Sequence, residues 1–228
     1  SKQWSLGFVV EPTNWMSASV DIFNVTIDDR ISNRTPQEVL ANNLTQFIAR
    51  DLPVELGGDG NPLTIDGVRG GWINVAGDKV SGADLSLAMR FDTGLGKVGF
   101  DVEGTYLRSY KTRKFESDPW SERVGEFGDF DFLWDLKLRW KHTASVSIDR
   151  GAWSTTLTEV YKSGYKSEYD GYGSGVILQE LGYPSKIKAY TLYNLSASYK
   201  GIKNATLTLG VKNLFDRDPP FSNHNVDN

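Results

Sequence analysis

The fold class is decided by residues 83–106, which read Ala83-Asp-Leu-Ser-Leu-Ala-Met-Arg-Phe-Asp-Thr-Gly-Leu-Gly-Lys-Val-Gly-Phe-Asp-Val-Glu-Gly-Thr-Tyr106. Apolar side chains occupy the odd positions up to Phe91 and the even positions from Val98 onward, with mostly polar residues between them. Successive side chains of a strand point to opposite faces, so each half is a strand with one apolar and one polar face. The link Thr93–Gly96 is short and rich in glycine, which is typical of a hairpin.

The same alternation recurs along the rest of the chain. It is clear near residues 6–10, 18–22, 144–148, 193–199 and 205–211. It is weaker in Trp153–Tyr161, where Glu159 falls on the apolar positions. We interpret this segment as a strand with a candidate β-bulge. The chain therefore reads as eight strands arranged in four hairpins.

Short and long connections alternate between these strands. The short links contain Gly, Pro or Asn and lie at Glu11–Asn14, Thr93–Gly96, Arg150–Gly151 and Gly201–Asn204. The long connections cover residues 31–72, 111–134 and 166–187. In an up-and-down antiparallel meander, this order places all short turns at one end and all long loops at the other. Transmembrane β-barrels of the bacterial outer membrane have that asymmetry, with short periplasmic turns and long extracellular loops.

Aromatic residues lie close to every short link. They are Trp15, Phe91, Trp153 and Tyr199. Aromatic rings favour the membrane–water interface, because the ring is apolar while a Trp or Tyr still reaches water with its polar group. These residues predict an aromatic girdle at the end of the sheet that carries the short turns.

One short helix is predicted inside the first long, extracellular loop. Thr35-Pro36-Gln-Glu38 has the form of a capping box with Pro at the first helical position. Val39, Leu40, Leu44, Phe47 and Ile48 then follow at helical spacing.

The composition of the 228 residues excludes several functions. A net charge of −4, from 25 Lys+Arg and 29 Asp+Glu, gives no electrostatic basis for binding nucleic acid. The chain has no cysteine and two histidines, so it offers neither a thiol site nor a multi-histidine metal site. We expect no catalytic residues, no metal site, no cofactor and no enzymatic activity. His142 is expected at the rim or in the lumen of the barrel.

The long loops are rich in aromatic rings and glycine. Aromatic side chains give a large contact area at a small entropic cost, which suits ligand binding. The alternative is that the rings only pack the loops against one another, and the sequence favours neither explanation. The candidate ligand-contact residues are Trp120, Phe127, Tyr165, Tyr169 and Tyr172.

The C-terminal stretch carries a family resemblance. Gly210-Val-Lys-Asn-Leu-Phe-Asp216, followed by Pro219-Pro220, resembles the end of the barrel of TonB-dependent outer-membrane receptors. Val20–Ile31 resembles an interior strand of the same barrels. The resemblance implies that residues 1–228 form part of a C-terminal β-barrel domain, about eight strands of a larger barrel with about 22 strands. The plug domain and the last strand of the family have no counterpart in this sequence.

The resemblance also implies active uptake of a scarce nutrient across the outer membrane of a Gram-negative bacterium. The ligand is usually an iron–siderophore, although cobalamin, saccharides and peptides are carried by some members. The implied partners are the TonB complex, acting through the plug, outer-membrane lipid and lipopolysaccharide, and a small-molecule or oligomeric nutrient. Polar positions of the strands would then face the lumen: Asp21, Asp84, Arg90, Asp101, Glu103, Thr206, Thr208 and Lys212.

Two other functions fit parts of the sequence. A complete eight-stranded outer-membrane barrel could act as an anchor or adhesin, with Arg90, Asp101 and Glu103 paired inside a narrow lumen. A soluble all-β glycan-binding module would instead pack its apolar strand faces against each other. The barrel interpretation predicts that Leu85/Leu87/Met89, Val98/Phe100/Val102 and Leu207/Leu209/Val211 point outward to lipid.

Overall fold

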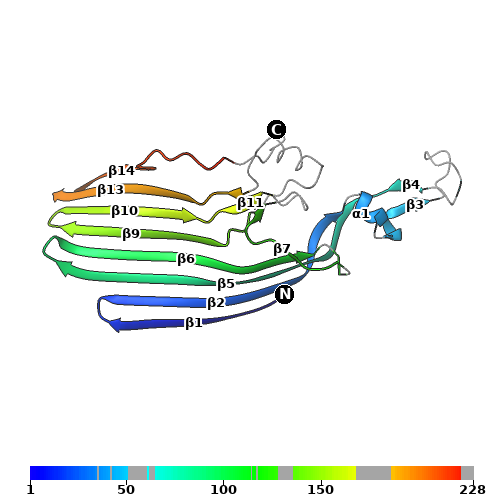
Figure 1. The fold of residues 1–228 in the computed structure, drawn as a ribbon, viewed down its shortest axis with the longest axis horizontal. Helices are drawn as coiled ribbons and strands as arrows, with labels where there is room; N and C mark the ends of the chain where they lie inside the picture. Colours follow the sequence, from blue (N-terminus) through cyan, green and yellow to red (C-terminus); the bar gives the residue numbers. More distant parts are fainter. Residues whose placement is uncertain are drawn as a thin grey trace. The chain divides into compact units, whose positions relative to one another are not determined.

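A meander of eight long strands is the main element of the fold. The computed structural model describes residues 1–34, 36–41, 43–50, 61, 65–113, 115–116, 118–127, 136–167 and 186–221. The strands are β1 (Lys2–Thr13), β2 (Met16–Arg34), β5 (Gly71–Thr93), β6 (Gly96–Arg113), β9 (Trp140–Arg150), β10 (Trp153–Lys162), β13 (Tyr190–Ile202) and β14 (Ala205–Val211). They lie side by side in chain order, and the short strand β7 (Ser121–Glu122) pairs with β6 (Figure 1). The pairings from β6 through β14 are antiparallel, which confirms the predicted up-and-down order.

All four short turns lie at one end of the sheet, on the left in Figure 1. We call this the short-turn end; its links are Asn14–Trp15, Gly94–Leu95, Gly151–Ala152 and Lys203–Asn204. The first turn begins later than predicted, because Pro12 belongs to β1. Proline is tolerated there because an edge strand leaves one row of its backbone groups outside the sheet ladder.

The register of β10 shows that the predicted β-bulge is wrong. Every residue of β10 pairs with one residue of β9 and one of β13 without a shift. Glu159 stands opposite Ala144 and Tyr193, so it lies on the same face as Leu157. A carboxylate therefore interrupts the apolar face of a regular strand.

The connections between the long strands contain smaller elements. The chain consists of two compact units, each of which we describe by itself. Residues 1, 26–78 and 112–121 form the first unit, and the remaining residues form the second. The first contains α1 (Pro36–Ala41), a 3₁₀ turn (Thr45–Phe47) and the paired strands β3 (Ile48–Arg50) and β4 (Ile65–Val68). The second contains a small sheet of β8 (Glu126–Phe127), β11 (Tyr165–Ser167) and β12 (Lys186–Ile187).

The predicted helix begins at Pro36 as expected but is shorter than its apolar spacing suggested. It ends at Ala41, and Asn43 adopts a left-handed conformation with φ of 48°. Asn tolerates this conformation, which reverses the chain direction after a helix. Phe47 and Ile48 therefore belong to the 3₁₀ turn and to β3. Val39 is fully buried and anchors the helix. Thr35, the predicted cap, lies outside the described residues.

The apolar face of the eight strands is not covered by a second sheet. Among the described residues, the buried hydrophobic side chains are Val39, Phe115, Val124 and Ile187, all in the connections. By contrast, Leu209 is 80% exposed and Leu207 is 57% exposed. The soluble module requires a sealed two-sheet core, and the described part of the chain contains none. Within that part, no helix combines the length and the apolar character needed to cross a membrane.

Candidate functional site

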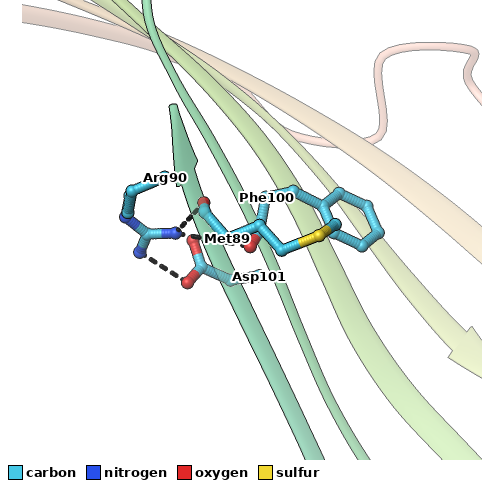
Figure 2. Close-up of polar contacts among 4 residues, drawn as sticks. All are labelled: Met89, Arg90, Phe100 and Asp101. Carbon is cyan, nitrogen blue, oxygen red and sulfur yellow. Dashed lines mark hydrogen bonds and ion pairs between the residues drawn. The ribbon is translucent and has the colours of Figure 1, made fainter. Parts of the chain in front are cut away.

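The polar face of the sheet carries an ordered set of side-chain contacts. Arg90 of β5 and Asp101 of β6 point toward one another, with Nη2 of Arg90 2.5 Å from Oδ1 of Asp101 (Figure 2). The same guanidinium donates to the backbone carbonyl of Met89 at 2.7 Å. Further along the two strands, Oγ1 of Thr105 donates to Oδ1 of Asp84 at 2.7 Å. The arrangement is a hydrogen-bonded, charged wall.

A cavity of about 490 Å³ opens on this face. Its lining includes three acids, Asp21, Asp84 and Glu103, and one cation, Lys141. The structure therefore brings three of the eight predicted lumen residues together around one depression. Thr208 joins the same face through Ser198, with the two hydroxyl oxygens 2.9 Å apart. The sheet is open at β1 and β14, so the lumen position of these residues stays a prediction.

Two of the candidate ligand-contact rings meet in the small sheet of the second unit. Phe127 of β8 and Tyr165 of β11 are packed edge to face, with ring centroids 6.3 Å apart. β8 and β11 run parallel, pairing Ser167 with Phe127. Both rings are partly exposed, which leaves ring surface for a ligand. Tyr169 and Tyr172 lie outside the described residues.

Trp120 belongs to the first unit and is held there by packing. The guanidinium of Arg113 lies over its ring, 4.6 Å from the centroid. A Cβ on Gly77 would approach the ring to 3.0 Å, so the ring packs closely on glycine backbone. Arg113 also donates to the carbonyl of Glu116 at 2.9 Å. These contacts support the packing alternative for this residue.

Glu122 is an anchor that the sequence analysis did not single out. Its carboxylate accepts hydrogen bonds from the Ser109 hydroxyl at 2.6 Å and from the backbone N–H of Tyr110 at 2.9 Å. It also accepts from the backbone N–H of Arg123 at 3.2 Å and of Val124 at 3.1 Å. Partial burial raises the pKa of Glu122, but these four donors outweigh it, so the pKa lies below its usual value.

The apolar face carries a polar cluster, the Glu159 network, formed by Trp140, His142, Glu159 and Tyr193. Nε1 of Trp140 donates to Nδ1 of His142 at 2.8 Å, which leaves Nε2 to donate to Glu159 at 2.9 Å. The Tyr193 hydroxyl donates to the second carboxylate oxygen at 2.5 Å. His142 shares its strand face with Trp140 and Ala144 and also contributes to the lining of the cavity described above, so its predicted position at the rim or in the lumen stays a prediction.

The C-terminal motif forms a stop at the end of β14. Asn213 adopts a left-handed conformation with φ of 51°. Its side-chain amide donates to the backbone carbonyl of Arg217 and accepts from the backbone N–H of the same residue. Its own N–H donates to the side chain of Asn194 at 3.0 Å. Phe215 packs edge to face on Tyr193, with centroids 5.4 Å apart. The motif is therefore explained by local geometry and by one contact with the Glu159 network.

Comparison with known proteins identifies relatives of the whole segment. A family model described as TonB dependent receptor-like, beta-barrel, matches residues 1–214. The FrpB iron transporter from Neisseria meningitidis (F3-3 variant) is similar with 12% identity and a TM-score of 0.57, over 96% of this chain and 26% of that one. A mutant of the ferric enterobactin receptor PfeA from Pseudomonas aeruginosa has 18% identity and a TM-score of 0.60, over 94% and 25%.

The copper transporter OprC is similar with 15% identity and a TM-score of 0.52, over 95% of this chain and 25% of that one. No curated protein sequence matches the chain. The chain thus spans about a quarter of the length of these solved structures. At these identities the similarity shows the fold alone.

Proposed function

The chain belongs to the TonB-dependent receptor family of outer-membrane β-barrels, and from this premise we propose that it is part of a transporter that takes up an iron–siderophore or similar complex into the periplasm. The observation that carries the proposal is an eight-stranded meander whose apolar face is not covered by any other sheet of the described residues, while the opposite face is charged. In a barrel, the first face suits lipid and the second suits an aqueous lumen.

The proposal assigns a role to each part of the segment. Residues 1–228 form part of the C-terminal barrel domain, and a plug and further strands complete the receptor. The plug connects to the TonB complex, which supplies the energy for transport. The apolar face contacts outer-membrane lipid and lipopolysaccharide. The lumen wall includes Asp21, Asp84, Arg90, Asp101, Glu103, Thr206, Thr208 and Lys212.

Ligand contact is assigned to the long loops. The Phe127–Tyr165 pair is the strongest candidate because both rings are partly exposed and are held at a fixed angle. Tyr169 and Tyr172 are expected to contribute, and Trp120 contributes less because Arg113 already occupies one face of its ring. A ring contact that excludes water is worth on the order of 1 kcal/mol, so loss of one ring weakens uptake without abolishing it.

Uptake of radioactive iron by the full-length receptor tests this proposal. The metal is supplied on enterobactin, on a hydroxamate siderophore and on citrate, with free Cu²⁺ as a separate arm. We expect uptake of at least one iron complex that stops in a strain without TonB. Phe127→Ala and Tyr165→Ala should lower that uptake several-fold. Trp153→Ala, which removes one ring of a pair at the short-turn end, is the matched control and should leave it unchanged.

Three outcomes would contradict the proposal. Uptake of every iron complex that is equal with and without the receptor would exclude iron transport. Uptake of Cu²⁺ alone would change the substrate class. Full uptake by both Phe127→Ala and Tyr165→Ala would assign ligand contact to other parts of the receptor.

A further inference from the structure

The loop that follows β6 returns to that strand at one carboxylate. Four donors converge on Glu122: the Ser109 hydroxyl and the backbone N–H groups of Tyr110, Arg123 and Val124. Two of them belong to β6 and two to the loop. In addition, the N–H of Arg123 donates to the carbonyl of Tyr110 at 2.7 Å. The carboxylate therefore joins the strand to the start of the next loop segment.

The contacts after Glu122 continue without interruption to the small sheet. Val124 is buried, with 5% of its surface exposed. Gly125 adopts a left-handed conformation with φ of 74°, and its N–H donates to the carbonyl of Lys137 at 2.7 Å. Its carbonyl accepts from the N–H of Lys166 at 2.8 Å, which starts the pairing of β8 with β11. Phe127 follows two residues later and packs on Tyr165.

We propose that Glu122 is a positioning residue that holds the Phe127–Tyr165 ring pair in the geometry that receives the ligand. This inference rests on the proposed function, because it takes the ring pair to be a ligand contact. The six residues from Glu122 to Phe127 carry a fixed set of backbone hydrogen bonds to β6, Lys137 and Lys166. Without the contacts of Glu122, the turn at Gly125 is no longer held in place. The angle between the Phe127 and Tyr165 rings is then no longer fixed.

The chemistry of the anchor makes the test sharp. An ionised carboxylate only accepts hydrogen bonds, whereas the amide of glutamine presents two donors on one of its two ends. A glutamine would keep its oxygen on the three backbone N–H groups that share Oε1 and turn its NH₂ toward the Ser109 hydroxyl, which can accept. Glu122→Ala, which removes both carboxylate oxygens, is therefore the informative variant. The matched control is Glu126→Ala, which removes a loop carboxylate four residues away that receives none of these four bonds.

Fluorine NMR of the full-length receptor, with fluorophenylalanine placed at position 127, reports the ring directly. We expect one narrow resonance in the parent protein, a shifted or broadened resonance in Glu122→Ala, and no change in Glu126→Ala. Ser109→Ala removes one of the four donors and should give a smaller shift in the same direction. An unchanged resonance in Glu122→Ala, or an equal change in Glu126→Ala, would overturn the proposal.

Uptake connects the geometry to function, with iron on enterobactin, on the hydroxamate and on citrate as the probes. Glu122→Ala should lower uptake several-fold in the parent receptor and have no additional effect in the Phe127→Ala background. An equal loss in both backgrounds would mean that Glu122 acts elsewhere and would overturn the inference. If Phe127→Ala itself has no effect, the ligand contact fails, while the fluorine resonance still decides whether Glu122 positions the ring.

Discussion

The two ends of the same sheet are stabilised by different means. At the short-turn end the chain reverses within two residues, using left-handed Gly151 and Asn204, and paired rings such as Trp153 and Tyr199 lie beside the turns. Toward the long-loop end, which is the opposite end, carboxylates collect donors from several segments. Glu122 receives four hydrogen bonds, and Glu159 bridges β9 and β13.

The geometry of the short-turn end is encoded by neighbouring residues, whereas that of the long-loop end depends on residues far apart in the sequence. A turn of two residues requires conformations that glycine and asparagine adopt easily, so it is encoded where it occurs. A carboxylate anchor depends in addition on donors from distant segments, which approach only after the strands have paired. Ser109 is 13 residues from Glu122, and Tyr193 is 34 residues from Glu159. The end that we propose to contact the ligand is thus the end whose geometry depends most on tertiary structure.

The largest expected effect lies between the two ends, where one face must be apolar. Leu87→Arg places a charge on that face and should destabilise the receptor by about 2–4 kcal/mol near the bilayer midplane. Ser86→Arg is the matched control, because it lies on the polar face of the same strand. Urea unfolding in lipid vesicles measures both variants. Equal losses of stability in the two variants would show that the two faces do not differ. The comparison of the two ends depends on that difference.

A smaller effect is expected in the Glu159 network. Tyr193→Phe leaves one oxygen of a partly buried carboxylate without its donor, which should cost about 1–3 kcal/mol. Tyr199→Phe on the same strand is the control, because its ring packs on Trp153 at the short-turn end. The same unfolding assay compares them. A loss for Tyr199→Phe that matches that of Tyr193→Phe would show that aromatic hydroxyls matter equally at both ends.

The sequence predicted the sheet well because its signals are short-range. Alternation identified all eight strands, and the four short turns lie within a few residues of their predicted positions. The bulge near Glu159 was the main error. Its position among apolar residues was a real signal, but it indicated a hydrogen-bonded acid on a regular strand. A single sequence does not reveal that His142 and Tyr193 supply the donors.

The short-turn end should tolerate change according to backbone conformation. Gly96 has φ of 133°, and a Cβ there would collide with the carbonyl oxygen of Asp149. Gly96→Ala should therefore cost about 1–2 kcal/mol, the penalty expected for an L-residue in a left-handed conformation. Gly94→Ala is the control, since a Cβ there meets open space. Equal stability of the two variants in urea would contradict this account of the turns.

The smallest effect concerns pH at the long-loop end. The pKa of Glu122 is lowered in the folded protein, so its contribution to loop stability is present above its usual value of 4.5. That contribution is lost as pH falls through the lowered pKa. Amide hydrogen exchange of Val124, corrected for intrinsic rates, should accelerate below pH 4.5. In Glu122→Ala, exchange should already be fast at neutral pH and independent of pH; protection that persists in this variant would contradict the prediction.

The candidate site was only partly accessible to sequence reasoning. The alternation placed Arg90 and Asp101 on one face, where the structure pairs them. Aromatic content identified Phe127 and Tyr165 as candidates, and their contact depends on a parallel pairing between segments about 40 residues apart, which no local pattern encodes. Glu122 belongs to no motif, and its four donors become visible only when the loop is folded.

Site-directed spin labelling of the full-length receptor in lipid vesicles tests most directly whether one face of the sheet meets lipid. The segment contains no cysteine, so single cysteines can be introduced along β14 at Thr206, Leu207, Thr208 and Leu209. We predict that labels at Leu207 and Leu209 are relaxed by molecular oxygen dissolved in the bilayer, and those at Thr206 and Thr208 by a water-soluble nickel chelate. Equal exposure of all four positions to the nickel chelate would contradict the transmembrane barrel and the function derived from it.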